Sequence, residues 1–126
     1  EAAALAARAA RARLEPREAP WTAEELALYD GSRDPEGPIL LAVDGVVLNV
    51  WKGRRFYEPG GEYHIFAGRD ATRLLARGLL EEEPAEEAAR PLSLAEEASL
   101  QTWLWTLKSK YEVVGVLAPS GHCGED

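Results

Sequence analysis

Residues 53–72 constrain the fold more than any other part of the chain, because they interrupt regular structure while concentrating aromatic side chains. The segment reads GRRFYEPGGEYHIFAGRDAT and contains four glycines, one proline, two tyrosines and one histidine. Glycine adopts backbone conformations that other residues avoid, and proline cannot continue a helix. This composition therefore favours a series of turns that shape a pocket. The regular elements of the domain have to lie on either side of it.

The sequence before this segment predicts a short helix and a hairpin. Residues 22–25 form a capping box, TAEE, that should start a helix running to Tyr29. Residues 39–43 and 46–50 are rich in Val, Leu and Ile and are separated only by Asp-Gly. That pattern is typical of two antiparallel strands joined by a tight turn.

After the segment, the sequence predicts a short helix followed by a loop. Asp70 can cap a helix that runs to Arg77, and Gly78 can end it. Residues 81–91 are rich in glutamate and contain proline, which predicts an acidic, solvated loop.

A second capping box predicts the longest helix of the domain. Ser93 and Glu96 form this box, and the helix should run to about Ser109. Residues 112–117 are typical of a closing strand. Strands on both sides of a helical middle predict an α+β fold. The expected buried face of the long helix consists of Leu100, Trp103, Leu104 and Leu107.

The chain divides into one domain with an extension at each end. Residues 21–117 form the expected domain, and residues 118–126 an expected flexible tail. Residues 1–20 form an Ala/Arg-rich arm and linker, helical over residues 1–13 and extended around Pro16 and Pro20. The arm can be interpreted either as a surface helix or as a segment that docks on a partner.

Charge and composition exclude several classes of function. The net charge of −8 argues against nucleic acid as a partner. Cys123 is the only cysteine, so the chain cannot form an internal disulfide, and His122 beside it is expected to lie in the loose tail rather than in a zinc site. No apolar run approaches the roughly 20 residues of a membrane span. Because the sequence contains no methionine, even at position 1, we expect a targeting peptide or anchor to be missing from its front.

The tyrosines are the best candidates for chemistry. Tyr57 and Tyr63 are six residues apart across a turn and can face one cavity, which Tyr111 can join from the start of the last strand. A tyrosinate oxygen is a known axial ligand of heme iron. The alternative is an ordinary core or rim tyrosine with a satisfied hydroxyl. No nucleophile–base pair is visible, so the sequence does not indicate an enzyme.

Several segments together resemble the membrane-associated progesterone receptor family, which has cytochrome b5-like heme/steroid-binding domains. The resemblance covers about residues 20–117 and is strongest toward the neuferricin and neudesin branch. The matching segments are residues 41–50, 52–57, 66–72, 100–103 and 108–115, with Tyr63.

The resemblance implies a small sheet, with helices that form a hydrophobic groove, and a set of ligand contacts. It implies that Tyr63 supplies the phenolate to the iron of a non-covalent, b-type ferric heme, with Tyr57 hydrogen-bonding nearby. Lys110 and Tyr111 are implied to line the pocket. Asp70 lies close by in the motif, where a role as a helix cap is an equal alternative.

The chain departs from related patterns at several positions. Glu58 stands where cytochrome b5 has the first of its two histidine ligands, and no second histidine lies in the expected helical segment, so bis-histidine ligation is excluded. Asn49 replaces a usual Asp and Trp51 a usual small hydroxyl residue, which we expect to alter local turn geometry. His64 is expected to be a rim residue, or to tune the phenolate by a hydrogen bond.

Three functions follow as hypotheses. The first is a non-catalytic regulatory or carrier domain that binds heme, with an open heme face that permits a heme-mediated dimer. The second is a heme-free accessory subunit of a larger membrane complex. The third is binding of a sterol or another apolar small molecule in the same groove. In each case we expect an intracellular protein associated with an endomembrane or organelle.

Overall fold

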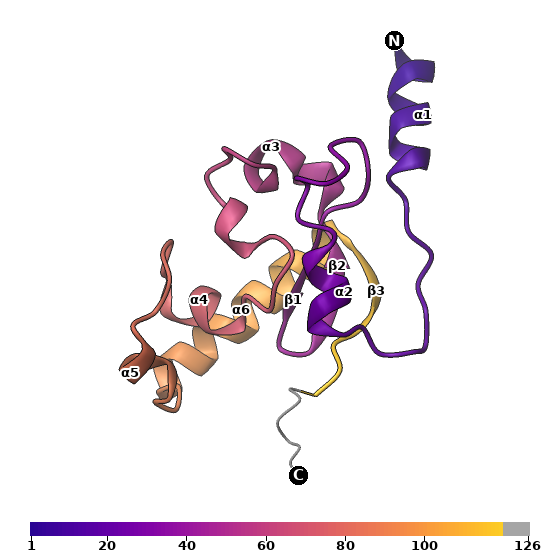
Figure 1. The fold of residues 1–126 in the computed structure, drawn as a ribbon. Helices are drawn as coiled ribbons and strands as arrows, with labels where there is room; N and C mark the ends of the chain where they lie inside the picture. Colours follow the sequence, from indigo (N-terminus) through magenta and orange to yellow (C-terminus); the bar gives the residue numbers. More distant parts are fainter. Residues whose placement is uncertain (120–126) are drawn as a thin grey trace.

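The computed structural model describes residues 1–119, so His122, Cys123 and most of the expected tail lie outside the described residues. Helices and a small sheet together form an α+β fold, as predicted from the sequence. The elements, drawn in Figure 1, are α1 (Ala2–Arg11), α2 (Ala23–Ala27), β1 (Leu40–Val43), β2 (Val46–Asn49), the 3₁₀ helix η1 (Trp51–Gly53), α3 (Arg54–Tyr57), the 3₁₀ helix η2 (His64–Phe66), α4 (Thr72–Arg77), α5 (Ala85–Ala88), α6 (Leu94–Lys110) and β3 (Glu112–Val116).

The sheet is antiparallel, with β2 between β1 and β3. The predicted hairpin is present, and Leu40 pairs with Asn49 at its open end. Asp44 and Gly45 both have positive φ, at 51° and 80°, as a two-residue turn between twisted strands requires. The last strand pairs with β2, with an irregularity in the register beside Val47.

Both faces of the sheet are buried. Alternate residues along β1 and β2 pack against two separate apolar clusters, because successive side chains of a strand point to opposite faces. Helices α4 and α6 cover one face, and α2 with Trp21 covers the other (Figure 1). The first cluster includes Leu41, Val43, Leu48, Leu74, Leu75, Leu100 and Leu107. The second consists of Trp21, Leu26, Leu40, Ala42, Val47 and Val114.

The two predicted capping boxes are confirmed. Thr22 Oγ1 accepts from the Glu25 N–H at 3.0 Å, and the Glu25 carboxylate accepts from the Thr22 N–H at 3.0 Å. Ser93 and Glu96 make the same reciprocal pair at 3.1 and 2.8 Å. Each box satisfies two backbone donors that have no partner within the helix.

The long helix α6 buries Leu100 and Leu107 fully and Trp103 and Leu104 in part. Its expected apolar face is therefore correct, and its last residue lies within one position of the prediction. Trp105 lies on the opposite side and is 74% exposed.

The prediction of a plain acidic loop over residues 81–91 is wrong in one respect, because α5 lies inside it. Its glutamates are also not merely solvated. Glu83 accepts from Arg73 at 2.9 Å and from Arg77 at 2.7 Å, which ties the segment to α4. These ion pairs join residues six and ten positions apart, and a local pattern of glutamates does not reveal them.

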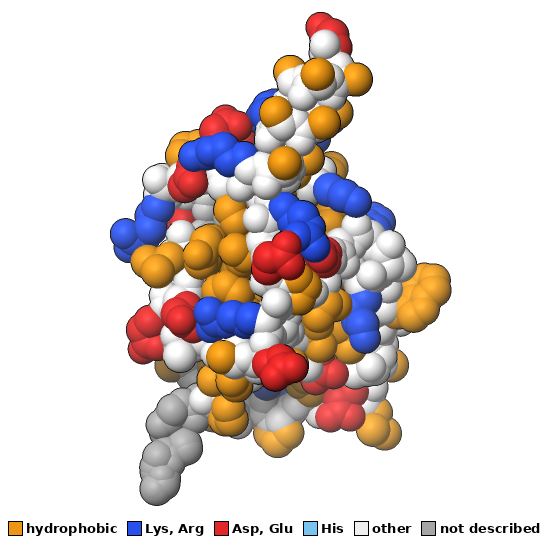
Figure 2. Space-filling view, turned by 90° about the vertical axis from the view of Figure 1, so that its right-hand side faces the viewer, with side chains coloured by type: hydrophobic (Ala, Val, Ile, Leu, Met, Phe, Trp, Pro, Cys, Tyr) orange, Lys and Arg blue, Asp and Glu red, His pale blue; other side chains and the backbone are white. Residues whose placement is uncertain are grey.

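The arm helix α1 has no buried residue and stands away from the body in Figures 1 and 2. Figure 2 also shows positive and negative side chains interspersed on the face below it, rather than one basic patch. Ala12, just past the helix, is buried against the body. Over residues 1–119, no helix has the length and apolar character needed to cross a membrane.

Candidate functional site

The segment 53–72 folds back on itself and so brings its two tyrosines together. After α3 the chain turns at residues 58–61, and the Tyr63 N–H donates to the Phe56 carbonyl at 2.7 Å. Gly61 lies so close to α3 that a Cβ there would be 2.4 Å from the same carbonyl oxygen. Only glycine permits this approach, and the turn places Tyr63 beside Tyr57.

Five aromatic rings form a continuous cluster at this end of the sheet. The Tyr63 ring centroid lies 6.0 Å from that of Tyr57, 5.8 Å from Phe56 and 5.7 Å from Phe66. The ring of Tyr111, which follows α6, meets Tyr57 edge to face at 6.3 Å. These separations are typical of favourable aromatic pairs. The structure thus brings together the three tyrosines that the sequence singles out.

Tyr111 fits because position 53 is a glycine. A Cβ on Gly53 would lie 2.4 Å from the Tyr111 hydroxyl oxygen and 3.4 Å from the Tyr57 ring. The backbone of η1 therefore forms the wall against which the Tyr111 hydroxyl rests. Sequence reasoning missed this role of Gly53, and it missed Phe56 and Phe66 as members of the cluster, although all three lie in the segment that it emphasised.

Burial makes two of the tyrosine hydroxyls harder to ionise than that of a free tyrosine. Tyr57 is 5% exposed, and burial raises the pKa of its hydroxyl well above 10, with the nearby Tyr111 and Tyr63 phenols adding to the shift. Burial also raises the pKa of Tyr111. Both therefore remain neutral at physiological pH and can donate a hydrogen bond. None of the three hydroxyls has a hydrogen-bond partner among residues 1–119, so their donors remain available for a ligand.

His64 is oriented by the backbone rather than by the tyrosines. Its Nδ1 lies 2.8 Å from the Tyr57 carbonyl oxygen. Because a carbonyl can only accept, Nδ1 carries the proton and donates. This bond closes the turn from inside, and it does not involve the Tyr63 hydroxyl.

The remaining residues singled out from the sequence lie outside the cluster. Lys110 is an exposed residue at the end of α6, next to Tyr111, and Glu58 is exposed on the turn. The Asp70 carboxylate accepts from the Thr72 N–H at 3.1 Å and from the Thr72 hydroxyl, at the start of α4. The structure thus places Asp70 at a helix start, although the N-cap residue itself is Ala71.

The tyrosines belong to the same apolar core as several side chains of α6 and η2. Tyr63, Ile65, Trp103, Leu104 and Tyr111 are all partly buried against the same core. The pockets that we describe for residues 1–119 are not lined by the tyrosines. A flat ligand that contacts the tyrosines would therefore not lie in any of these pockets. The donor set nevertheless fits heme, because a tyrosine oxygen and a neutral neighbouring hydroxyl lie in apolar surroundings.

The side chains of the described residues limit the kind of metal site that is possible. Among the described residues, no three His, Cys, Asp or Glu side chains lie close enough to hold a bare metal ion. Tyrosine is the anionic ligand type that the cluster does offer.

The chain is similar to proteins of a known domain family. The profile of the cytochrome b5-like heme/steroid binding domain matches residues 22–117. Membrane steroid-binding protein 2 of Oryza sativa subsp. japonica is 47% identical over 96 residues, which are 76% of this chain and 36% of that protein. Human membrane-associated progesterone receptor component 2 is 43% identical over 105 residues, covering 81% of this chain and 46% of that protein. The chain thus spans less than half the length of these relatives.

A solved structure extends the similarity to the fold. A hypothetical protein from Arabidopsis thaliana, described as having a cytochrome b5 like fold, superposes with a TM-score of 0.68 at 37% sequence identity. The match covers 80% of this chain and 92% of that one.

Proposed function

The chain belongs to the cytochrome b5-like heme/steroid-binding domain family, and from that premise we propose that it binds ferric heme through the Tyr63 oxygen as a non-catalytic regulatory or carrier domain. The observation that supports this most is the convergence of Tyr63 with two tyrosines that burial keeps neutral. A single phenolate among neutral phenols is stabilised by the hydrogen bonds that they can donate.

Each residue has a separate role in this proposal. Tyr63 supplies the anionic oxygen, and Tyr57 donates a hydrogen bond close to it. Tyr111 closes the apolar side, with Lys110 at the rim. His64 holds the turn that orients Tyr63 through the Tyr57 carbonyl. Asp70 is left out of the contacts, because one of its carboxylate oxygens accepts two hydrogen bonds from Thr72 at the start of α4.

Bound ferric heme would supply an iron centre that takes an oxygen ligand, and an anionic ligand favours the ferric state. This makes binding, sensing or delivery of heme a better fit than electron transfer. The exposed ring of Phe56, which contacts Tyr63, lies at the outer edge of the cluster and is the side chain whose movement admits a flat ligand.

The test is a hemin titration followed by absorbance, with Tyr63→Phe as the decisive variant. We expect a high-spin ferric spectrum in the native protein and loss of that spectrum in Tyr63→Phe. Tyr29→Phe is the matched control, since Tyr29 packs edge to face on Trp21 in the other apolar cluster. An identical spectrum in Tyr63→Phe and the native protein would refute the ligand assignment.

A second candidate is a steroid or a similar apolar ligand in the same place, favoured by the names of the relatives. Trp103 and Leu104 of α6 are partly buried against the same core as the tyrosines and offer apolar surface. A progesterone titration separates the two candidates, because a steroid needs no phenolate. Binding of progesterone that persists in Tyr63→Phe, without a hemin spectrum in either protein, would favour this second candidate. For the whole protein, the relatives' names support association with a membrane.

A further inference from the structure

A pocket of about 550 Å³ lies beside α3, and most of the side chains that line it are basic. Its positive charge comes from both the arm and the body, because Arg8 belongs to α1 and the other basic residues belong to η1 and α3. The tyrosines do not line this pocket, so it is separate from the proposed heme site. The lining residues are Arg8, Lys52, Gly53, Arg54, Arg55, Phe56 and Glu58.

The positive charge of this pocket is largely uncompensated, which is unusual in a chain with a net charge of −8. Within residues 1–119, Arg33, Arg54 and Arg55 are the only arginines that form no ion pair with a carboxylate. Two of these three line the pocket. Glu58 is the single acidic residue of the lining, and it forms no ion pair with a described residue either. An anionic ligand would therefore meet charges that the protein leaves free.

The three arginines of the pocket also keep most of their hydrogen-bond donors. The Arg54 guanidinium lies 3.9 Å from the Trp51 ring centroid and donates once, to the Trp51 carbonyl at 3.4 Å. Arg8 donates through Nε to Glu36 at 3.2 Å in an exposed ion pair, and such pairs are weak. The Arg55 side chain makes no hydrogen bond within residues 1–119. Because a guanidinium has five N–H donors, each arginine can still bind an oxygen of a ligand.

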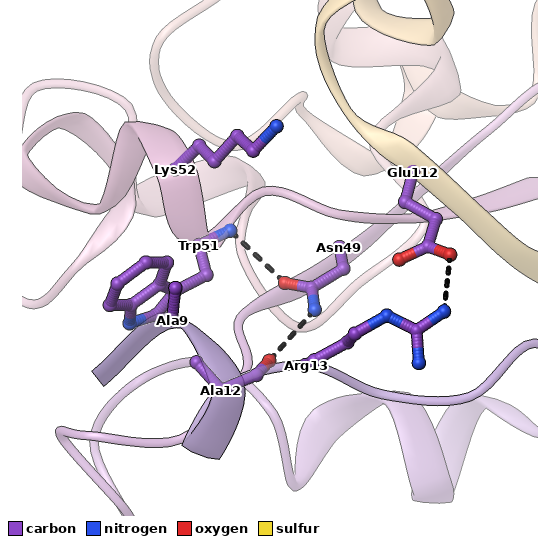
Figure 3. A pocket seen from close by; sticks show the side chains of 7 residues that line it. All are labelled: Ala9, Ala12, Arg13, Asn49, Trp51, Lys52 and Glu112. Carbon is purple, nitrogen blue, oxygen red and sulfur yellow. Dashed lines mark hydrogen bonds and ion pairs between the residues drawn. The ribbon is translucent and has the colours of Figure 1, made fainter. Parts of the chain in front are cut away.

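Lys52 adds positive charge without a direct contact in our proposal. Figure 3 shows a neighbouring pocket of about 250 Å³ between the arm and η1, with the Lys52 side chain directed away from α1 and from the Trp51 indole. In that neighbouring pocket the Asn49 amide is occupied, since it donates to the Ala12 carbonyl at 2.9 Å. The free donors of this region are therefore those of the arginines beside α3.

We propose that the pocket beside α3 binds the phosphate groups of a small, multiply phosphorylated compound, with Arg8, Arg54 and Arg55 as its contacts. A phosphate monoester carries a charge of about −1.5 to −2 at pH 7, so two such groups offset the charge of the lining, whereas one carboxylate does not. The planar donors of arginine match phosphate oxygens in pairs. The compound is either free in solution or the headgroup of a lipid, since both present the same phosphate chemistry.

The test is a calorimetric titration of the chain with inositol trisphosphate, with unphosphorylated inositol as the neutral control. We expect the trisphosphate to bind and inositol not to bind. Arg55→Gln should weaken binding by about tenfold, because it removes a charged donor. Arg33→Gln removes the same charge from an exposed arginine outside the pocket and should leave the affinity unchanged. Equal affinity of Arg55→Gln and the native chain, or an equal loss in both variants, overturns the proposal.

Glu58 provides a variant with the opposite expected effect. Glu58→Gln removes the only negative charge of the lining and should strengthen trisphosphate binding several-fold. Glu97→Gln makes the same change at an exposed glutamate of α6 and should have no effect. An unchanged or weaker affinity in Glu58→Gln would show that the ligand does not lie in this pocket.

Sedimentation with vesicles distinguishes the two sources of the phosphate groups. The vesicles consist of phosphatidylcholine, with or without phosphatidylinositol bisphosphate. A lipid headgroup is the ligand if the native chain sediments only with the phosphorylated vesicles and Arg55→Gln sediments less. A free compound is the ligand if the chain binds inositol trisphosphate but stays in solution with both kinds of vesicle. Binding to neither probe overturns the proposal.

Discussion

Replacing Gly53 by alanine tests whether the Tyr111 hydroxyl really rests on the backbone of η1. The backbone itself accepts alanine, since φ is −101° and ψ 28°. The new methyl carbon, however, would lie 2.4 Å from the Tyr111 hydroxyl oxygen, whereas ordinary contact begins at 3.4 Å. The hydroxyl must therefore move by about 1 Å. It carries the Tyr111 ring with it, and that ring packs edge to face on Tyr57.

The expected cost follows from overpacking of a well-packed cluster. Such insertions destabilise proteins by about 1–3 kcal/mol. With a urea dependence of about 1–3 kcal/mol per molar, the unfolding midpoint of Gly53→Ala should fall by about 1 M. Tyr111→Phe alone should change stability by no more than about 0.5 kcal/mol, because Tyr111 is only partly buried and its hydroxyl is not among the buried polar atoms that lack a partner.

The double variant gives the sharpest result. In Gly53→Ala/Tyr111→Phe the closest contact becomes the ring carbon at 3.3 Å, close to ordinary contact, so stability should return nearly to that of Tyr111→Phe. The measurement is urea unfolding of the native chain, both single variants and the double variant. A coupling of at least about 1 kcal/mol is expected between two residues in direct contact. Additive effects, or a Gly53→Ala variant as stable as the native chain, would refute the proposed contact.

Two further predictions concern local electrostatics and the arm. The Ser93 backbone N–H and then Arg90 hold the pKa of Glu96 at about 2, below its ordinary 4.5. Because the folded-state pKa is the lower one, this stabilisation is present above pH 4.5 and is lost as the pH falls toward 2. The melting temperature of Glu96→Gln should therefore fall less between these pH values than that of Glu97→Gln, and equal pH profiles would contradict the prediction. Asn49→Asp should release the arm, at a cost of about 1–3 kcal/mol, because a carboxylate cannot donate to the Ala12 carbonyl. Limited trypsin digestion should then cleave at Arg11 and Arg13 faster than in the native chain, and an unchanged rate would show that Asn49 does not anchor the arm.

The elements that the sequence predicts well are those whose signals are local. The Asp44-Gly45 turn and the capping boxes at Thr22 and Ser93 each involve residues within a few positions of one another. The acidic segment was harder to predict, because its short helix is tied to α4 by the pairing of Glu83 with Arg73. Such contacts join residues whose proximity is known only from the fold.

In the candidate site, too, local features could be predicted from the sequence and contacts between distant segments could not. Tyr57 and Tyr63 could be proposed as neighbours, because a single glycine-rich turn separates them. The fit of Tyr111 against Gly53 could not, since it depends on how α6 ends relative to η1. Sequence reasoning also missed that Asn49 holds the arm. The replacement of a usual Asp by Asn indicates a hydrogen bond to the arm only once the Ala12 carbonyl is known to lie beside it.

The hydrogen bonds between the two ends of the domain have a mechanical consequence. The Trp21 N–H donates to the Val116 carbonyl at 2.8 Å, and the Ala118 N–H donates to the Trp21 carbonyl at 2.7 Å. The chain thus enters and leaves the domain at one point, beside the end of β2 that begins with Val46, whereas η1 and the tyrosine cluster follow its other end. Tension applied between the two flanking segments would first detach Ala12 from Asn49 and Arg17 from Val114, and would then act on the two hydrogen bonds of Trp21. The same geometry would let the domain be inserted into a loop of another protein without distorting either one.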